Sequence, residues 1–291
     1  MRSRDRNAAS VTAPVSESAR TRAAAIRRKA GQAMGYGRGT RLTLILSVVF
    51  LLTLAVGIYA LSEGVYMAGY LFVGDALWLN ILAYAVMGLL ALTLALPLAA
   101  SVYRQACLAV LGSGFASPAE NLPVAQARPE PVGFFYPFTS GRAYIRCLAV
   151  GLETLAWLTL MVGLPVAGFR SLEGLVAYLE NGGMAGGLGD LLTLGAGILC
   201  LAFGVLMLFL SGWRSGFAYL AFVHEDLPLG EVNRYFKGFR RSFVRPFVLR
   251  ISMTGWMLLS VAAVLVPLVL HTIPWGLCCG AMYGAELERK G

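Results

Sequence analysis

Charged residues are scarce in this chain. Asp, Glu, Lys and Arg make up 13% of its 291 residues, against about 25% in an ordinary soluble domain. Hydrophobic residues make up 58%, and the mean hydropathy is +0.70. Several apolar runs approach or exceed the ~20 residues that cross a ~30 Å hydrocarbon layer. The composition therefore excludes an ordinary soluble globular protein and indicates an integral membrane protein.

Residues that build metal and disulfide sites are also few. The chain has two histidines and five cysteines, and the cysteines lie in or beside apolar runs rather than in external loops. No Cys/His spacing typical of a metal site occurs, and no disulfide framework is expected. No phosphate loop, G-x-S-x-G or H-E-x-x-H motif is present. We therefore expect no metal, no cofactor and no catalytic residues, and a protein that is not an enzyme.

The apolar runs predict an all-α fold, a polytopic bundle of about six membrane helices formed by residues 42–291. We place the spans at about 42–61, 77–101, 144–169, 190–210, 247–270 and 275–287. Pro97 predicts a kink near the end of the second span. The last run holds only about 13 residues, which is short of a full crossing. It could be a tilted sixth span, a re-entrant half-helix or a tail on the far side.

The distribution of Lys and Arg predicts the orientation. With six crossings and the N-terminus inside, every one of the 24 Lys and Arg residues except Arg170 faces the cytoplasm. With five crossings Arg289 and Lys290 also move outside, which leaves 21 of 24 inside. Both counts obey the positive-inside rule, and six spans give the better count. We predict a multi-pass protein of the cell membrane with a cytoplasmic N-terminus.

Residues 1–41 form a basic tail, in which ten Arg and Lys residues face only Asp5 and Glu17 as acids. Such a composition buries too little apolar surface to order itself, so we expect this tail to be disordered. A short helix from Ser16 to Ala33 is the alternative. An organelle transit peptide has a similar Arg-, Ala- and Ser-rich composition, but here the first apolar run follows directly.

The stretch from Gly230 to Arg250 predicts an amphipathic helix in the membrane surface, at about Glu231–Val244. At 100° per residue its apolar side chains fall within an arc of roughly 100°, and its cations project from the other side. The apolar arc consists of Val232, Tyr235, Phe236, Phe239 and Phe243. Rings at the acyl boundary and cations among phosphates suit such a helix. The predicted lipid-binding residues are Arg234, Lys237, Arg240, Arg241 and Arg245. Because the chain's cations cluster beside apolar runs, its net charge of +9 favours anionic lipid over nucleic acid as the partner.

Glu153 stands in the third predicted span. A carboxylate inside a span is costly and is a candidate proton or cation site. Arg104, Arg146 or Arg250 could pair with it. The structural alternative is that Glu153, at a rise of roughly 10 Å from Arg146, reaches the inner interface of the membrane.

Two further patterns allow a functional and a structural interpretation. The run His224-Glu225-Asp226 could ligate a cation, but no second histidine lies on that side, and ending one helix and capping the next is the commoner use. Glycines in the spans offer small surfaces for close helix packing. They are Gly151, Gly163, Gly168, Gly195, Gly197, Gly204 and Gly255.

The last quarter of the chain, from Tyr219 to Leu287, carries a set of motifs that invites comparison. The motifs are Tyr219 before the acidic turn, Arg241-Ser242, Ser252 with Gly255-Trp256, Pro274-Trp275 and Ala281-Met282-Tyr283. In these motifs the chain resembles a family of uncharacterised bacterial polytopic membrane proteins, classified as a domain of unknown function. A fainter likeness is to the membrane domains of glycerophosphodiester phosphodiesterases. Trp275 replaces the tyrosine that usually follows the proline in that family. The resemblance implies a six-helix integral membrane fold and supplies no activity.

These patterns lead to two hypotheses about function. The first is a non-enzymatic scaffold or accessory protein that contacts anionic lipid through the basic helix and can serve a membrane-protein partner. The alternative is a small permease or channel with Glu153 in its path. No convergent set of residues supports an intramembrane enzyme.

Overall fold

A computed structural model describes residues 19–35, 39–74, 77–115, 131–180, 188–210, 212–239 and 267–288, together with residues 248, 249, 251, 253 and 259. These residues form helices and turns, with no strand among them. The elements of the first half are α1 (Ala19–Gly35), α2 (Thr40–Val73), α3 (Leu77–Leu90), η1 (Ala91–Ala95), α4 (Leu96–Gly112) and η2 (Pro131–Thr139). Those of the second half are α5 (Gly141–Leu158), η3 (Thr159–Gly163), α6 (Leu164–Glu180), α7 (Leu188–Leu210), α8 (Gly212–Val223), α9 (Leu229–Phe239), η4 (Leu268–Thr272) and α11 (Ile273–Glu288).

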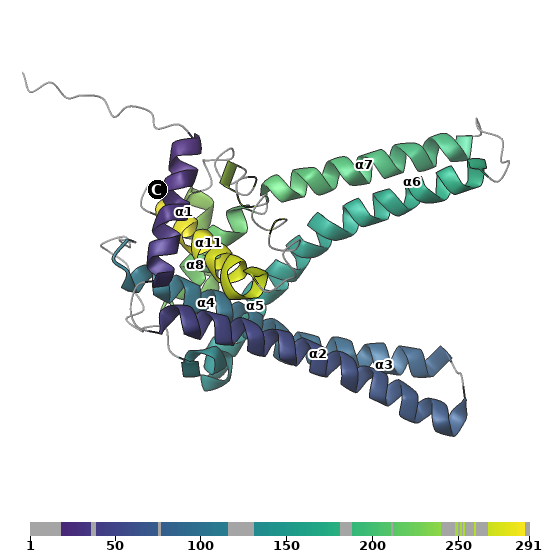
Figure 1. The fold of residues 1–291 in the computed structure, drawn as a ribbon, viewed down its shortest axis with the longest axis horizontal. Helices are drawn as coiled ribbons and strands as arrows, with labels where there is room; N and C mark the ends of the chain where they lie inside the picture. Colours follow the sequence, from purple (N-terminus) through teal and green to yellow (C-terminus); the bar gives the residue numbers. More distant parts are fainter. Residues whose placement is uncertain are drawn as a thin grey trace, which may run out of the picture.

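The molecule consists of a head and two long arms (Figure 1). The head contains α1, α4, α8, α9, α11 and the start of α5, which share most of the buried apolar core. The first arm is the hairpin of α2 and α3, and the second arm is the hairpin of α6 and α7. The two arms diverge from the head. Large apolar side chains such as Leu71, Phe72 and Leu199 are exposed along them, which is the surface that a lipid environment would cover.

Four helical stretches are long and apolar enough to cross a membrane, among the residues described. They are Thr40–Val73, Leu77–Gly112, Gly141–Glu180 and Leu268–Glu286. The first three coincide with the first three predicted spans but continue into segments that the sequence treated as connections. The predicted fourth span corresponds to α7, where a shorter apolar helix covers Gly189–Gly204. The predicted fifth span lies mostly outside the described residues.

The last helix differs from the prediction in length. The sequence suggested a run of about 13 residues after Pro274, too short to cross. In the structure the described apolar stretch Leu268–Glu286 covers 19 residues, because Pro274 does not interrupt the helix. The preceding segment η4 is a π-helix, and its wider turn absorbs the missing N–H and the bulk of the proline ring.

The same arrangement occurs three times among the residues that the structure describes. The π-helices η1, η3 and η4 each end two residues before a proline, namely Pro97, Pro165 and Pro274. The backbone N–H groups of Leu96 and Ile273 donate to the carbonyls of Ala91 and Leu268, five residues back. At η1 the hydroxyl of Tyr144 donates to the Thr93 carbonyl at 3.2 Å, which replaces the bond that Pro97 cannot make. The helices therefore continue through these prolines.

The expectation of a disordered tail differs from the structure at Ala19–Gly35, which forms α1. Ile26, Ala30 and Met34 recur every four residues and are all buried in the head. Trp275 of α11 donates its indole N–H to the Arg27 carbonyl at 3.3 Å, and Arg22 pairs with Glu286 at 3.2 Å. The apolar face of α1 thus packs on α11, although residues 1–41 as a whole have a basic and polar composition. Residues 1–18 and 36–38 lie outside the described residues.

Candidate functional site

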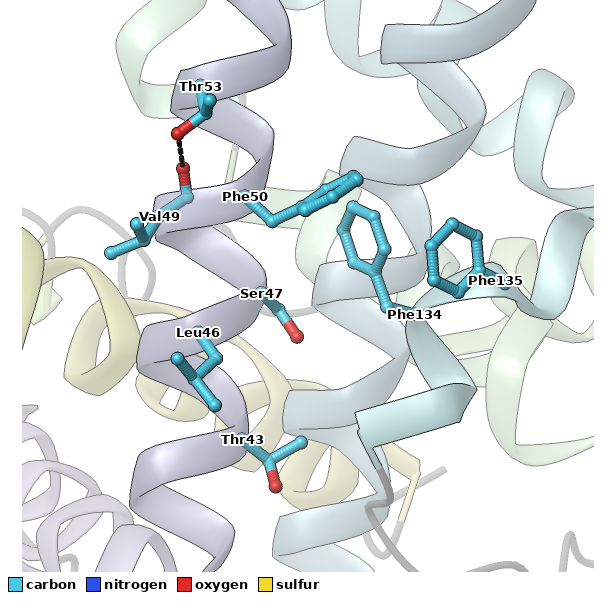
Figure 2. A pocket seen from close by; sticks show the side chains of 8 residues that line it. All are labelled: Thr43, Leu46, Ser47, Val49, Phe50, Thr53, Phe134 and Phe135. Atoms are coloured by element: carbon cyan, nitrogen blue, oxygen red, sulfur yellow. Dashed lines mark hydrogen bonds between the residues drawn. The ribbon is translucent and has the colours of Figure 1, made fainter.

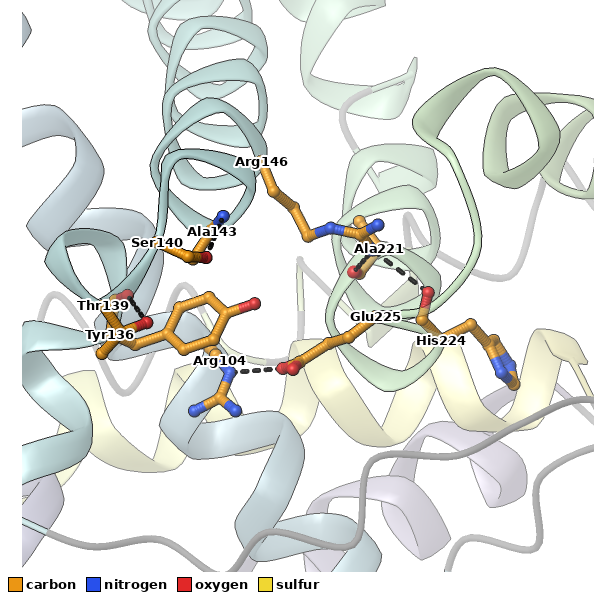
Figure 3. A network of polar contacts seen from close by, with 9 residues as sticks. All are labelled: Arg104, Tyr136, Thr139, Ser140, Ala143, Arg146, Ala221, His224 and Glu225. Atoms are coloured by element: carbon orange, nitrogen blue, oxygen red, sulfur yellow. Dashed lines mark hydrogen bonds and ion pairs between the residues drawn. The ribbon is translucent and has the colours of Figure 1, made fainter.

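A buried arginine organises the turn between α8 and α9. The last carbonyls of a helix have no partner within the helix. Arg146, which enters from α5 and exposes only 2% of its surface, reaches those of α8 (Figure 3). One terminal nitrogen donates to the Ala221 carbonyl at 2.5 Å and to the His224 carbonyl at 3.1 Å. The other donates to the carbonyl of Leu227. Arg146 therefore ties three backbone groups of this turn to α5.

A second arginine meets the side chains of the same turn. The Arg104 Nε on α4 donates to the Glu225 carboxylate at 2.5 Å. The Arg104 guanidinium also lies 3.8 Å from the ring centre of Tyr136 on η2, as in a cation–π contact. Burial is the main cause that raises the pKa of Tyr136 to about 12, and the negative charge of Glu225 adds to it. Arg142 donates to the Asp226 carbonyl at 2.6 Å.

His224 points into the head instead of toward this cluster. Its Nε2 lies 2.8 Å from Oε1 of Glu288, and both side chains are buried. Tyr219, one turn earlier on α8, is fully buried, and burial together with the nearby Glu288 raises its pKa. A neutral phenol is therefore the stable form of Tyr219. His224, Glu225 and Asp226 thus follow the end of α8, as the structural interpretation of this run predicted. Their contacts with Arg104, Arg142 and Glu288 were not predicted. The described residues hold no group of three His, Cys, Asp or Glu side chains that could ligate a metal.

The predicted surface helix is represented by α9. Arg234 and Lys237 are exposed on it, while Val232 is buried and Phe236 packs with its ring 6.0 Å from that of Phe217 on α8. Two members of the apolar arc therefore contact the head, and not the acyl boundary that the sequence suggested for them. Tyr235 remains 44% exposed. Arg240, Arg241 and Arg245, and the end of the predicted helix, lie outside the described residues.

Glu153 is half-buried on α5. Its carboxylate lies within electrostatic range of Arg214 at the start of α8 and of the Trp157 side chain. Its Oε2 atom is buried and has no hydrogen-bond partner among the described residues. Of the partners predicted for it, Arg104 and Arg146 bind the α8–α9 turn, and Arg250 lies outside the described residues.

The sequence did not reveal the roles of Arg104, Arg146, Tyr136 and Glu288. The two arginines counted there as orientation signals and as possible partners of Glu153. One signal was available in the sequence. In the predicted topology both arginines flank apolar runs on the cytoplasmic side, and so does the acidic turn. An arginine buried there would need carboxylates or carbonyls as partners. The sequence does not say which of them become buried.

Comparison of the chain with protein-family models, with curated proteins and with solved structures finds no match. The family resemblance of the last quarter of the chain therefore stays a hypothesis that rests on its motifs.

Proposed function

We propose that the protein is a multi-pass, non-enzymatic membrane scaffold, with its head on the cytoplasmic side and α9 against anionic lipid headgroups. The exposure of Arg234 and Lys237 on the face of α9 turned away from α8 carries this proposal. Neither cation forms an ion pair with another described residue. Val232 and Phe236 hold the opposite face on the head, so the cations project from a fixed support.

The electrostatic contribution of this face is modest for each residue and useful in sum. A cation close to an anionic membrane surface contributes about 1 kcal/mol. Arg240, Arg241 and Arg245 follow Lys237 in the sequence and would extend the same basic segment. A scaffold held in this way presents its head to a membrane-protein partner at a set height above the bilayer.

Hydrogen exchange of the full chain in lipid nanodiscs tests the proposal. Amides of residues 229–239 should exchange more slowly in discs that contain phosphatidylglycerol than in discs of phosphatidylcholine alone, and salt should reduce the difference. The double variant Arg234→Gln, Lys237→Gln should lose the difference. Arg170→Gln, which removes an exposed cation of the second arm paired with Glu173, should keep it. Equal exchange of the unmodified protein in both kinds of disc would refute lipid binding by α9.

A second function is favoured by one observation, the buried Oε2 atom of Glu153, which has no hydrogen-bond partner in the part of the chain that the structure describes. A half-buried carboxylate in a membrane helix, with Arg214 near, is suited to exchange a proton or a cation. In this permease or channel, Glu153→Gln would abolish ion or proton flux in proteoliposomes while the protein stays folded and monodisperse. Flux equal to that of the unmodified protein would remove Glu153 from any such path.

A further inference from the structure

A groove of about 320 Å³ runs along α2 where this helix meets η2 (Figure 2). Its walls are Thr43, Leu46, Ser47, Val49, Phe50, Thr53, Phe134 and Phe135. From Thr43 to Thr53 the groove follows α2 for ~15 Å, at 1.5 Å per residue. Leu46, Val49 and Phe50 are between 40% and 51% exposed. The groove therefore opens on the outer surface of the most apolar of the four candidate spans.

The wall opposite α2 is held in a fixed shape. The ring centres of Phe50 and Phe134 lie 4.9 Å apart, and those of Phe134 and Phe135 lie 5.4 Å apart, both edge to face. Behind this wall the Ser101 hydroxyl donates to the Phe134 carbonyl at 2.6 Å. At Gly133 a Cβ atom would stand 2.0 Å from Nε2 of Gln105, so η2 lies directly on α4. The groove is preformed, as ligand sites usually are.

The two ends of the groove differ in chemistry. At the end farther along α2, the Thr53 hydroxyl donates to the Val49 carbonyl at 3.0 Å. This hydroxyl is therefore satisfied within its own helix. At the other end Thr43 and Ser47 bring two hydroxyl groups (Figure 2). Arg41 is exposed at the start of α2, but at 100° per residue it lies on the opposite side of the helix from Thr43 and Phe50. An occupant with an apolar chain and a polar end would match this order.

We propose that this groove binds one acyl chain of a membrane phospholipid, with the polar headgroup at the end that Thr43 and Ser47 form. Lipid is the medium on the outer side of a membrane helix, and its chains are the apolar molecules present there at the highest concentration. Aromatic and aliphatic side chains form the chain-binding walls, and no charged side chain lines the groove. The site is separate from α9 and requires only that α2 cross the membrane.

Photo-labelling of the full-length protein tests the site. The protein is reconstituted with phosphatidylglycerol that carries a diazirine in one acyl chain, irradiated, digested and mapped by mass spectrometry. Labels should concentrate on residues 43–53 and 133–135. Val49→Trp, which fills the groove from a position already 40% exposed, should reduce this labelling several-fold. Leu52→Trp, on the same helix at 45% exposure but outside the groove, should leave it unchanged.

The results separate this site from general contact with lipid. Labelling spread evenly over the exposed sides of both arms, or labelling of residues 43–53 that Val49→Trp leaves intact, would overturn the proposal. The variants at Arg234 and Lys237 should leave groove labelling unaltered, so the two lipid contacts can fail independently.

Discussion

Arg146 shows how a charged side chain becomes part of the head. A buried cation without partners would be strongly unfavourable, and the usual solution is a carboxylate. Arg146 is satisfied by backbone carbonyls of the α8–α9 turn instead. The negative end of the helix dipole of α8 lies at the same place, which adds a favourable field. The charge and the turn therefore stabilise each other.

Replacing Arg146 should consequently destabilise the head. Arg146→Met keeps most of the side-chain length but leaves the carbonyls of Ala221, His224 and Leu227 without this donor. We expect the free energy of unfolding to fall by about 3 kcal/mol. Thermal unfolding of the detergent-solubilised protein measures this change. Arg142→Met, which removes an exposed arginine with one bond to Asp226, is the control and should cost less than about 1 kcal/mol. Equal loss in the two variants would contradict the role of Arg146.

At this scale the sequence was a partial guide. It correctly indicated that His224, Glu225 and Asp226 end a helix, because polar residues between two apolar periodic segments have few other uses. The partners of these residues lie far away in the chain, since Arg104 is 121 residues from Glu225 and Glu288 is 64 residues from His224. Periodicity describes one helix at a time and carries no information about which distant side chains meet.

Between elements, glycines decide how closely two helices approach. In the second arm Gly168 of α6 faces Gly197 of α7, and a Cβ atom on Gly168 would stand 2.7 Å from the Gly197 carbonyl oxygen. Gly204 meets the ring of Pro165 in the same way. Contacts of this kind between small residues are a main source of helix association in lipid.

Gly168→Ala should therefore separate the helices of the second arm. The added methyl group meets rigid backbone and must displace it, at a cost of about 1–3 kcal/mol. Gly174→Ala is the matched control, because a Cβ there meets nothing within 4 Å and alanine is the better helix former by about 1 kcal/mol. Resistance of the second arm to limited proteolysis should fall in the first variant and rise or stay equal in the second. The same response in both would remove close packing at Gly168 from the account.

The glycine pattern was predictable in kind but not in detail. Of the glycines that the sequence proposed for packing, Gly151, Gly168, Gly197 and Gly204 do contact a neighbouring helix closely. Gly195, on another side of α7, meets nothing within 4 Å. The predicted third span ran through Pro165, as the structure does. The continuation of the last helix through Pro274 was missed, since a proline signals a break unless its surroundings satisfy the freed carbonyl.

At the scale of the whole molecule, the longest helices exceed the thickness of a bilayer. The 34 residues of α2 extend ~51 Å, and a hydrocarbon layer is ~30 Å thick. Such a helix must tilt, or project beyond one face of the membrane. Figure 1 shows two arms that diverge from one head, so in a bilayer the arms would tilt in different directions. Apolar runs in the sequence identified the arms, whereas their divergence depends on packing in the head that no single run encodes.

The arrangement predicts where each part is accessible. We expect the hairpin ends of both arms on the outer face, since Glu63, Glu173 and Glu180 lie toward them and Arg170 is the only Lys or Arg of the two arms beyond the head. Cysteine substitutions test this in a Cys200→Ala background, in which the other cysteines are all buried. Leu71→Cys and Tyr178→Cys should react with an impermeant maleimide added to intact cells, because these positions are 79% and 52% exposed.

Asp226, in the turn between α8 and α9, is the matching cysteine position for the cytoplasmic side of the membrane. Asp226 is exposed and engages Arg142 only through its backbone carbonyl, so Asp226→Cys should leave the turn intact. It should react only after the membrane is permeabilised, if the head is cytoplasmic. Reaction of Asp226→Cys from outside would invert the orientation and remove α9 from the anionic inner leaflet. Protection of Leu71→Cys and Tyr178→Cys on both sides would instead place the ends of the arms within the hydrocarbon, and tilt alone would then have to absorb the length of α2.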